Sequence, residues 1–123
     1  MDTELSTLPI VDQTSLANII EFSDDSTDVL AELTDMFLGE TPARIAAILS
    51  GAESQDCEKV RRVAHALVNS ASNFGAHRLS GMCRALEKDA RSGHISDAGP
   101  QVSEIAEECD LVRQILEDIR HQR

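Results

Sequence analysis

Tryptophan and tyrosine are absent from the chain, and only three phenylalanines occur among its 123 residues. A core with so few aromatic side chains has to be built from Leu, Ile, Val, Ala and Met. Strands favour β-branched and aromatic residues, whereas Ala and Leu are strong helix formers. The composition therefore favours packed helices over a β-sheet. The length suits one domain, and we expect residues 1–123 to fold as a single unit.

Paired cysteines and long apolar runs are also absent. Cys57, Cys83 and Cys109 are odd in number, stand 26 residues apart each time and form no Cys-x-x-Cys pair. This spacing argues against a disulfide framework and a zinc site, so we expect small core residues in a reducing compartment. No segment is apolar and long enough for a membrane span or a signal peptide, and a cytoplasmic location is therefore expected.

Positive charge is scarce, because 11 Lys and Arg stand against 22 Asp and Glu, a formal net charge of −11. Nucleic acids and anionic membranes both attract cationic surfaces, so neither is an expected partner. The basic residues are nevertheless concentrated: residues 59–91 hold seven of them against two acidic ones, a local charge of +5. This basic segment has two explanations. Either it meets a partner with a focused negative site, or the acidic residues elsewhere simply solvate the other faces of the molecule. Its members are Lys59, Arg61, Arg62, Arg78, Arg84, Lys88 and Arg91.

Five segments carry helical periodicity, and short stretches of turn-forming residues separate them. We expect a short first helix at about residues 12–21, with Asp12 as its cap, lying as a lid over the others. The second helix is expected over about residues 25–50, ended by Gly51. Its apolar positions stay in phase across Pro42, which favours one helix bent at the proline over two separate helices.

The remaining three helices have clear start and stop signals. The third should run from an N-cap at Asp56 to Gly75, and the fourth over about residues 76–92, stopped by Gly93. The fifth should begin near Pro100 and reach the C-terminus. Because neither one helix nor a pair could bury all these apolar stripes, the sequence predicts an all-α fold. We expect an antiparallel up-down-up-down four-helix bundle with a short N-terminal helix.

His65 lies on the polar side of the third predicted helix. The apolar stripe of that helix consists of Val60, Val63, Ala64, Leu67, Ala71 and Phe74. On a wheel of about 100° per residue, His65 points roughly 150° away from this stripe. The imidazole therefore faces water, either as an incidental surface histidine or as a nucleophile displayed from a rigid helix.

Residues one turn away surround the imidazole on the helix surface. They are Arg61, Arg62, Val68 and Asn69, with Ser72 one turn further along. Two guanidiniums, an amide and a hydroxyl suit a phosphoryl group, because arginine gives charge-assisted hydrogen bonds to its oxygens. No second metal ligand stands one turn from His65, and no nucleophile elbow or paired carboxylates indicate a hydrolase. The chain also lacks a Gly-rich nucleotide loop, so any phosphoryl group must come from a partner, and we expect neither a metal nor a cofactor.

Three motifs follow one another from the third predicted helix into the fourth. They are Ala64-His65-Ala66-Leu67, then Ser70-Ala71-Ser72-Asn73-Phe74-Gly75-Ala76, then Leu79-x-x-x-Cys83-x-x-Leu86-Glu87. Together they resemble the histidine-containing phosphotransfer (HPt) domain of multistep two-component phosphorelays, most strongly over residues 56–91. The resemblance implies a four-helix bundle whose exposed histidine accepts a phosphoryl group from a receiver-domain aspartate and passes it to another.

Applied to this chain, the resemblance implies that His65 is the phospho-acceptor. Arg61 and Arg62 would provide local positive charge, and Val68, Asn69 and Ser72 would lie on the phosphoryl and partner surface. The expected partners are response-regulator receiver domains, with a hybrid sensor kinase as a further candidate. We expect a monomeric carrier without kinase activity of its own.

Two positions depart from the usual HPt pattern, which has lysine three residues after the histidine and glycine four residues after it. Here these positions are Val68 and Asn69. The first change removes a cation near the phosphoryl oxygens, and the second adds a side chain where a receiver approaches. They favour a rival hypothesis, in which the bundle is an HPt-like module that binds receivers without phosphotransfer.

Overall fold

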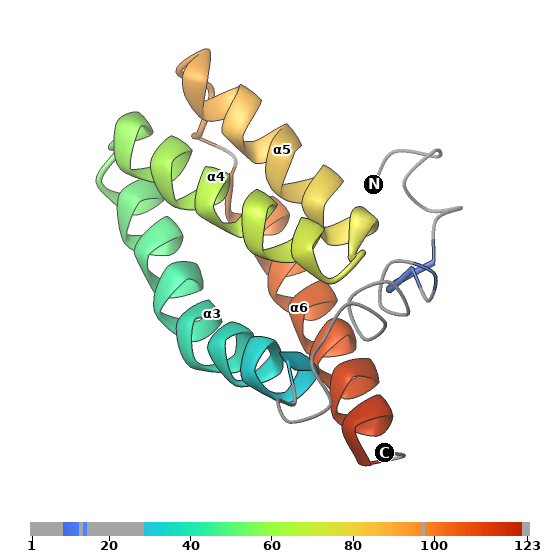
Figure 1. Ribbon diagram of the computed structural model, residues 1–123. Helices are drawn as coiled ribbons and strands as arrows, with labels where there is room; N and C mark the ends of the chain where they lie inside the picture. Colours follow the sequence, from blue (N-terminus) through green and yellow to red (C-terminus); the bar gives the residue numbers. More distant parts are fainter. Residues whose placement is uncertain (1–8, 13, 15–28, 97, 122–123) are drawn as a thin grey trace.

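The computed structural model describes residues 9–12, 14, 29–96 and 98–121. Its helices are α3 (Val29–Glu53), α4 (Cys57–Asn73), α5 (His77–Arg91) and α6 (Ala98–His121), and these described ranges contain no strand. Consecutive helices run antiparallel (Figure 1). Both α3 and α5 contact α4 and α6, which closes the helices into a ring of four. The predicted up-down-up-down bundle is confirmed, while the predicted helix at residues 12–21 lies largely outside the described residues.

The first of these helices, α3, continues unbroken through Pro42, as the phase of its apolar positions predicts. The predicted start at residue 25 lies outside the described residues. The predicted stop at Gly51 is wrong, because α3 extends to Glu53 with Gly51 inside it and buried. A Cβ on Gly51 would lie 3.0 Å from Cγ2 of Val60. Glycine is therefore present to let α4 pack closely against α3, and it does not end the helix.

The first three helices end with the same backbone arrangement. After each helix one residue adopts a positive φ, and its N–H and the next N–H donate back to carbonyls of the last turn. These residues are Gln55 (φ 55°), Gly75 (φ 71°) and Gly93 (φ 80°). At the end of α4, the Gly75 N–H donates to the Ser72 carbonyl at 3.1 Å and the Ala76 N–H donates to the Ala71 carbonyl at 3.0 Å. The chain thus reverses within a few residues, and α5 starts beside the end of α4.

The starts of α4 and α5 agree with the sequence signals, whereas the start of α6 does not. The Asp56 carboxylate accepts the Lys59 N–H at 3.1 Å, so the predicted N-cap of α4 is confirmed. The bounds of α5 differ from the predicted 76–92 by one residue at each end. However, α6 begins at Ala98 and not at Pro100. As the third residue of the helix, Pro100 removes no hydrogen bond, because the first four N–H groups of a helix have no intrahelical partner.

The core is almost entirely aliphatic, as the composition predicts. Phe37 and Phe74 meet edge to face, with ring centroids 5.5 Å apart. Cys83 and Cys109 are buried free thiols. Burial raises the pKa of Cys109 to about 12 and also raises the pKa of Cys83. Cys57 is free as well but only partly buried. The largest fully buried side chains include Ile48, Leu67, Leu79, Leu86, Ile95, Ile105 and Leu116.

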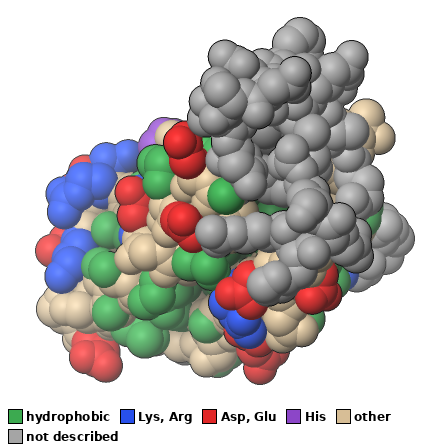
Figure 2. All heavy atoms as spheres, turned by 60° about the horizontal axis from the view of Figure 1, so that its bottom comes forward, with side chains coloured by type: hydrophobic (Ala, Val, Ile, Leu, Met, Phe, Trp, Pro, Cys, Tyr) green, Lys and Arg blue, Asp and Glu red, His purple; other side chains and the backbone are tan. Residues whose placement is uncertain are grey.

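Some apolar side chains remain at the surface. Met36 and Leu49 on α3 and Leu111 on α6 are exposed. Figure 2 shows hydrophobic side chains interspersed with acidic ones on one face of the molecule. Scattered exposure of this kind is normal for a folded domain. Within the described part of the chain, no helix is both long and apolar enough to cross a membrane.

Residues 9–12 pack against the turn between α4 and α5. Val11 is buried, and the Asp12 N–H donates to the Gly75 carbonyl at 2.8 Å. The Asp12 carboxylate accepts the Thr14 N–H at 2.9 Å, and its second oxygen lies 3.5 Å from Nε2 of His77. The turn is thus held both by the end of α4 and by this segment.

We expect Gly75→Ala to lower the free energy of unfolding by about 1–2 kcal/mol, because a Cβ is strained in the left-handed backbone conformation. Gly39→Ala is the matched control. Its Cβ would enter open space inside α3, so it should raise the free energy of unfolding by about 0.5–1 kcal/mol. Urea unfolding followed by circular dichroism measures both variants. Equal effects of the same sign would contradict the positive φ at Gly75.

Candidate functional site

His65 lies near the middle of α4 and presents its imidazole to solvent, as the helical wheel predicts. Its side chain is 57% exposed, whereas Val60, Ala64 and Leu67 on the same helix are completely buried. The helix is capped at its start and closed by a positive-φ residue after its end. The backbone that carries His65 is therefore well fixed on both sides.

The imidazole of His65 is held from α5. Its Nδ1 lies 3.0 Å from Oε1 of Glu87, and Nη2 of Arg91 donates to the same oxygen at 3.1 Å. The Glu87 side chain is only 10% exposed, so its carboxylate is fixed between the two helices. An ionised carboxylate can only accept hydrogen bonds, so Nδ1 carries the hydrogen and Nε2 of the neutral ring keeps its lone pair.

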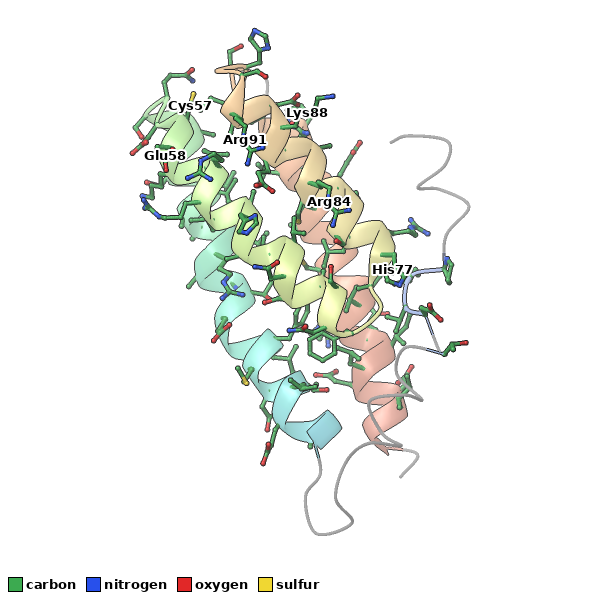
Figure 3. The ribbon with its side chains drawn as sticks, turned by 45° about the horizontal axis from the view of Figure 1, so that its top comes forward. Cys57, Glu58, His77, Arg84, Lys88 and Arg91 are labelled. Carbon is green, nitrogen blue, oxygen red and sulfur yellow. The ribbon has the colours of Figure 1, made fainter. Side chains whose placement is uncertain are left out.

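A hollow of about 470 Å³ lies beside His65, between α4 and α5. From α4, the buried Val68 and the exposed Asn69 line it. The residues that line the hollow from α5 are all charged. They follow one another by three, one and three residues along the chain, which places them on one face of the helix. They are Arg84, Glu87, Lys88 and Arg91. Figure 3 shows the three cations in succession along α5, and they outnumber the single carboxylate.

Three predicted site residues do not line this hollow. Arg61 donates from Nε to the Glu58 carboxylate at 3.0 Å, and this hydrogen bonding lowers the pKa of Glu58. Arg62 is exposed elsewhere on α4. Ser72 donates to the Val68 carbonyl at 2.8 Å, and its hydroxyl lies 3.0 Å from that of Ser80. The structure therefore brings His65 together with Val68 and Asn69 but not with the other three.

The α5 residues of the hollow are the ones that the sequence pattern does not single out as site residues. A usable signal exists, because residues equally far from the turn lie level with each other in two antiparallel helices. His65 stands ten residues before Gly75, and Glu87 stands twelve after it. Counting outward from the predicted turn would thus have pointed to this part of α5.

Neither His77 nor His94 lines the hollow. His77 is exposed at the start of α5 near Asp12, and His94 is exposed after the end of α5. The side chain of His121 lies outside the described residues. Among the side chains that the structure describes, no group of three His, Cys, Asp or Glu is arranged to hold a metal ion.

Residues 32–120 match the Hpt domain, and the chain belongs to this family. It is similar to two phosphorelay proteins LuxU. The Vibrio harveyi protein is 32% identical over 79 residues, which are 64% of this chain and 69% of that protein. The Vibrio cholerae protein is 29% identical over 89 residues, 72% of this chain and 79% of that protein.

The fold is also similar to the crystal structure of histidine-containing phosphotransfer protein B (HptB) from Pseudomonas aeruginosa PAO1. The TM-score is 0.84 at 27% sequence identity, over 95% of this chain and 99% of that one. The function of the chain is accordingly histidine phosphotransfer in a phosphorelay, as the three sequence motifs predict. Carriers of this family in general have no kinase activity of their own and work with receiver domains and kinases.

We expect the neutral imidazole of His65 to carry its hydrogen on Nδ1, and Glu87→Ala to shift the hydrogen toward Nε2, because the carboxylate that accepts it is removed. The ¹⁵N chemical shifts of the two ring nitrogens above pH 8 measure the tautomer. Glu58→Ala is the control, since this exposed carboxylate is bound to Arg61 and not to His65. An unchanged tautomer in Glu87→Ala would disprove the orienting role.

Proposed function

We propose that His65 is the residue that carries the phosphoryl group and that it exchanges this group with aspartates of receiver domains. The observation that carries the proposal is the state of its imidazole, which is exposed on a fixed helix with Nδ1 bound to Glu87. Among the hydrogen bonds of the described residues, Nε2 takes part in none. This nitrogen is therefore available to a partner.

The transfer step follows from this geometry. Nε2 attacks the phosphorus of the receiver's aspartyl phosphate in line, the N–P bond forms, and the P–O bond to the aspartate breaks. The aspartate leaves as a carboxylate. The phosphorylated ring is then cationic and still donates its Nδ1 hydrogen to Glu87, whose negative charge stabilises it. The reverse sequence delivers the group to the aspartate of a second receiver.

The chain contributes position and charge to this reaction and leaves the phosphoryl source to its partners. Val68 and Asn69 are compatible with this role. Val68 is buried in the bundle, so it does not obstruct the imidazole. Asn69 lies at the edge of the hollow, where a receiver would meet an amide. The three cations of α5 provide positive charge on the opposite side.

We also propose that the chain acts as a monomer without kinase activity, receives its phosphoryl group from a receiver such as that of a hybrid sensor kinase, and works in the cytoplasm. The three free thiols support a reducing compartment. The absence of a Gly-rich nucleotide loop from the sequence supports dependence on a partner for the phosphoryl group.

Incubation with a phosphorylated receiver is expected to give acid-labile, alkali-stable phosphate on wild-type chain and none on His65→Gln. The physical reason is that the glutamine amide has no nucleophilic nitrogen. Radiolabel retained on the chain after gel separation measures the transfer. His77→Gln is the matched control and should be labelled like wild type, because His77 lies outside the hollow. Equal label on His65→Gln and wild type would refute the assignment of His65, and label from ATP alone would refute the dependence on a partner.

A further inference from the structure

Two neighbouring cations of α5 have no partner among the residues that the structure describes. Arg84 and Lys88 are exposed and line the hollow beside His65. They are four residues apart, which makes them neighbours on the helix surface. Glu87, which lies between them in the sequence, is bound to His65 and Arg91. Asp89, next to Lys88, accepts a hydrogen bond from Gln101 at 3.3 Å. Within the described part of the chain, neither Arg84 nor Lys88 forms an ion pair or a side-chain hydrogen bond.

This lack of partners is unusual in a chain with twice as many acidic as basic residues. Arginines elsewhere in the described residues are mostly bound to a carboxylate. The pairs are Arg44–Glu40, Arg61–Glu58, Arg78–Glu108, Arg91–Glu87 and Arg113–Asp110. Arg84 and Lys88 instead repel each other, and an external anion would relieve this repulsion.

On α4 no cation faces the hollow. Val68 occupies the position where HPt domains usually have lysine, and it is buried. Arg61 is bound to Glu58, and Arg62 lies outside the hollow. The positive charge that a partner would meet beside His65 is therefore on α5.

We propose that Arg84 and Lys88 form the docking site for the receiver domain and bind carboxylates of the partner around its phospho-accepting aspartate. This proposal rests on the proposed function and adds the direction of approach, which is from the α5 side. The net charge of −11 repels an acidic partner from most of the surface, so this cationic pair orients the encounter. Arg84 and Lys88 thus orient the receiver, while His65, held by Glu87, performs the transfer.

The double variant Arg84→Glu/Lys88→Glu tests the docking site. Transfer from a phosphorylated receiver is measured against receiver concentration at low and high salt. We expect the half-saturating receiver concentration to rise at least about tenfold and the rate at saturation to change less than about threefold. The salt dependence of the apparent second-order rate constant should also become weaker or reverse. Far-ultraviolet circular dichroism checks the fold of each variant.

Arg62→Glu is the matched control, because it reverses an exposed cation one turn before His65 but outside the hollow. We expect its half-saturating concentration to stay within about threefold of wild type. Labelling by phosphoramidate, a small donor that needs no docking, should be equal in all three proteins. A loss in Arg62→Glu as large as in the double variant, or no loss in the double variant, overturns the proposal. Reduced phosphoramidate labelling of the double variant alone would assign the cations to the phosphoryl group and also overturn it.

Failure of the proposed function has a different signature. If no receiver labels His65 in the wild-type chain, the phosphotransfer role of His65 fails. Calorimetric titration with unphosphorylated receivers then decides the docking proposal. Binding that is lost in the double variant and kept in Arg62→Glu supports the docking site. Binding that survives in the double variant, or no binding to the wild-type chain, overturns it.

Discussion

The register between α4 and α5 is the constraint on which the site depends. His65 and Glu87 come from different helices, and their 3.0 Å contact exists only because the turn at Gly75 aligns them. A slip of one residue in α5 would move its side chains by about 1.5 Å along the axis and rotate them by about 100°. The Asp12 N–H donates to the Gly75 carbonyl, so the N-terminal segment helps to hold this register. A turn far from the imidazole thus fixes its orientation.

Two buried carboxylates illustrate how differently α5 is tied to its neighbours. Glu87 satisfies one oxygen with two donors, Nδ1 of His65 and Nη2 of Arg91, and faces the hollow. Glu108 of α6 contacts Arg78 at 3.2 Å, and burial raises its pKa while the Arg78 charge lowers it. The second pair links α5 to α6 and does not approach His65. The contact between Glu87 and His65 is the one that determines which ring nitrogen carries the hydrogen, because it holds an exposed titratable ring.

Short-range sequence signals predict most of the fold, but they predict only the α4 side of the site. Periodicity, the Asp56 cap and the positive-φ glycines are short-range signals, and they locate the four helices within one to three residues wherever the helix ends are described. Gly51 misleads because its small size serves packing against Val60, which is a tertiary reason. The exposure of His65 follows from the wheel. The α5 residues beside His65 do not follow from the wheel, because the rotation of α5 about its own axis depends on the packing of the whole bundle. Closeness in the sequence also misleads, since a neighbour such as Arg61 is already bound to a nearer side chain.

Because Val68 is buried, α4 carries the imidazole while α5 carries the positive charge beside it. One turn after His65, α4 directs this position into the core, where the residue is 6% exposed. A lysine there would have to extend from the core edge to reach water, whereas valine fills the space and keeps α4 closely packed beneath the imidazole. Positive charge near the imidazole then has to come from the facing helix. On α5 it can accumulate at 84, 88 and 91 because Glu87 is the one carboxylate among the residues that line the hollow, and the residual repulsion makes this helix face complementary to an acidic partner.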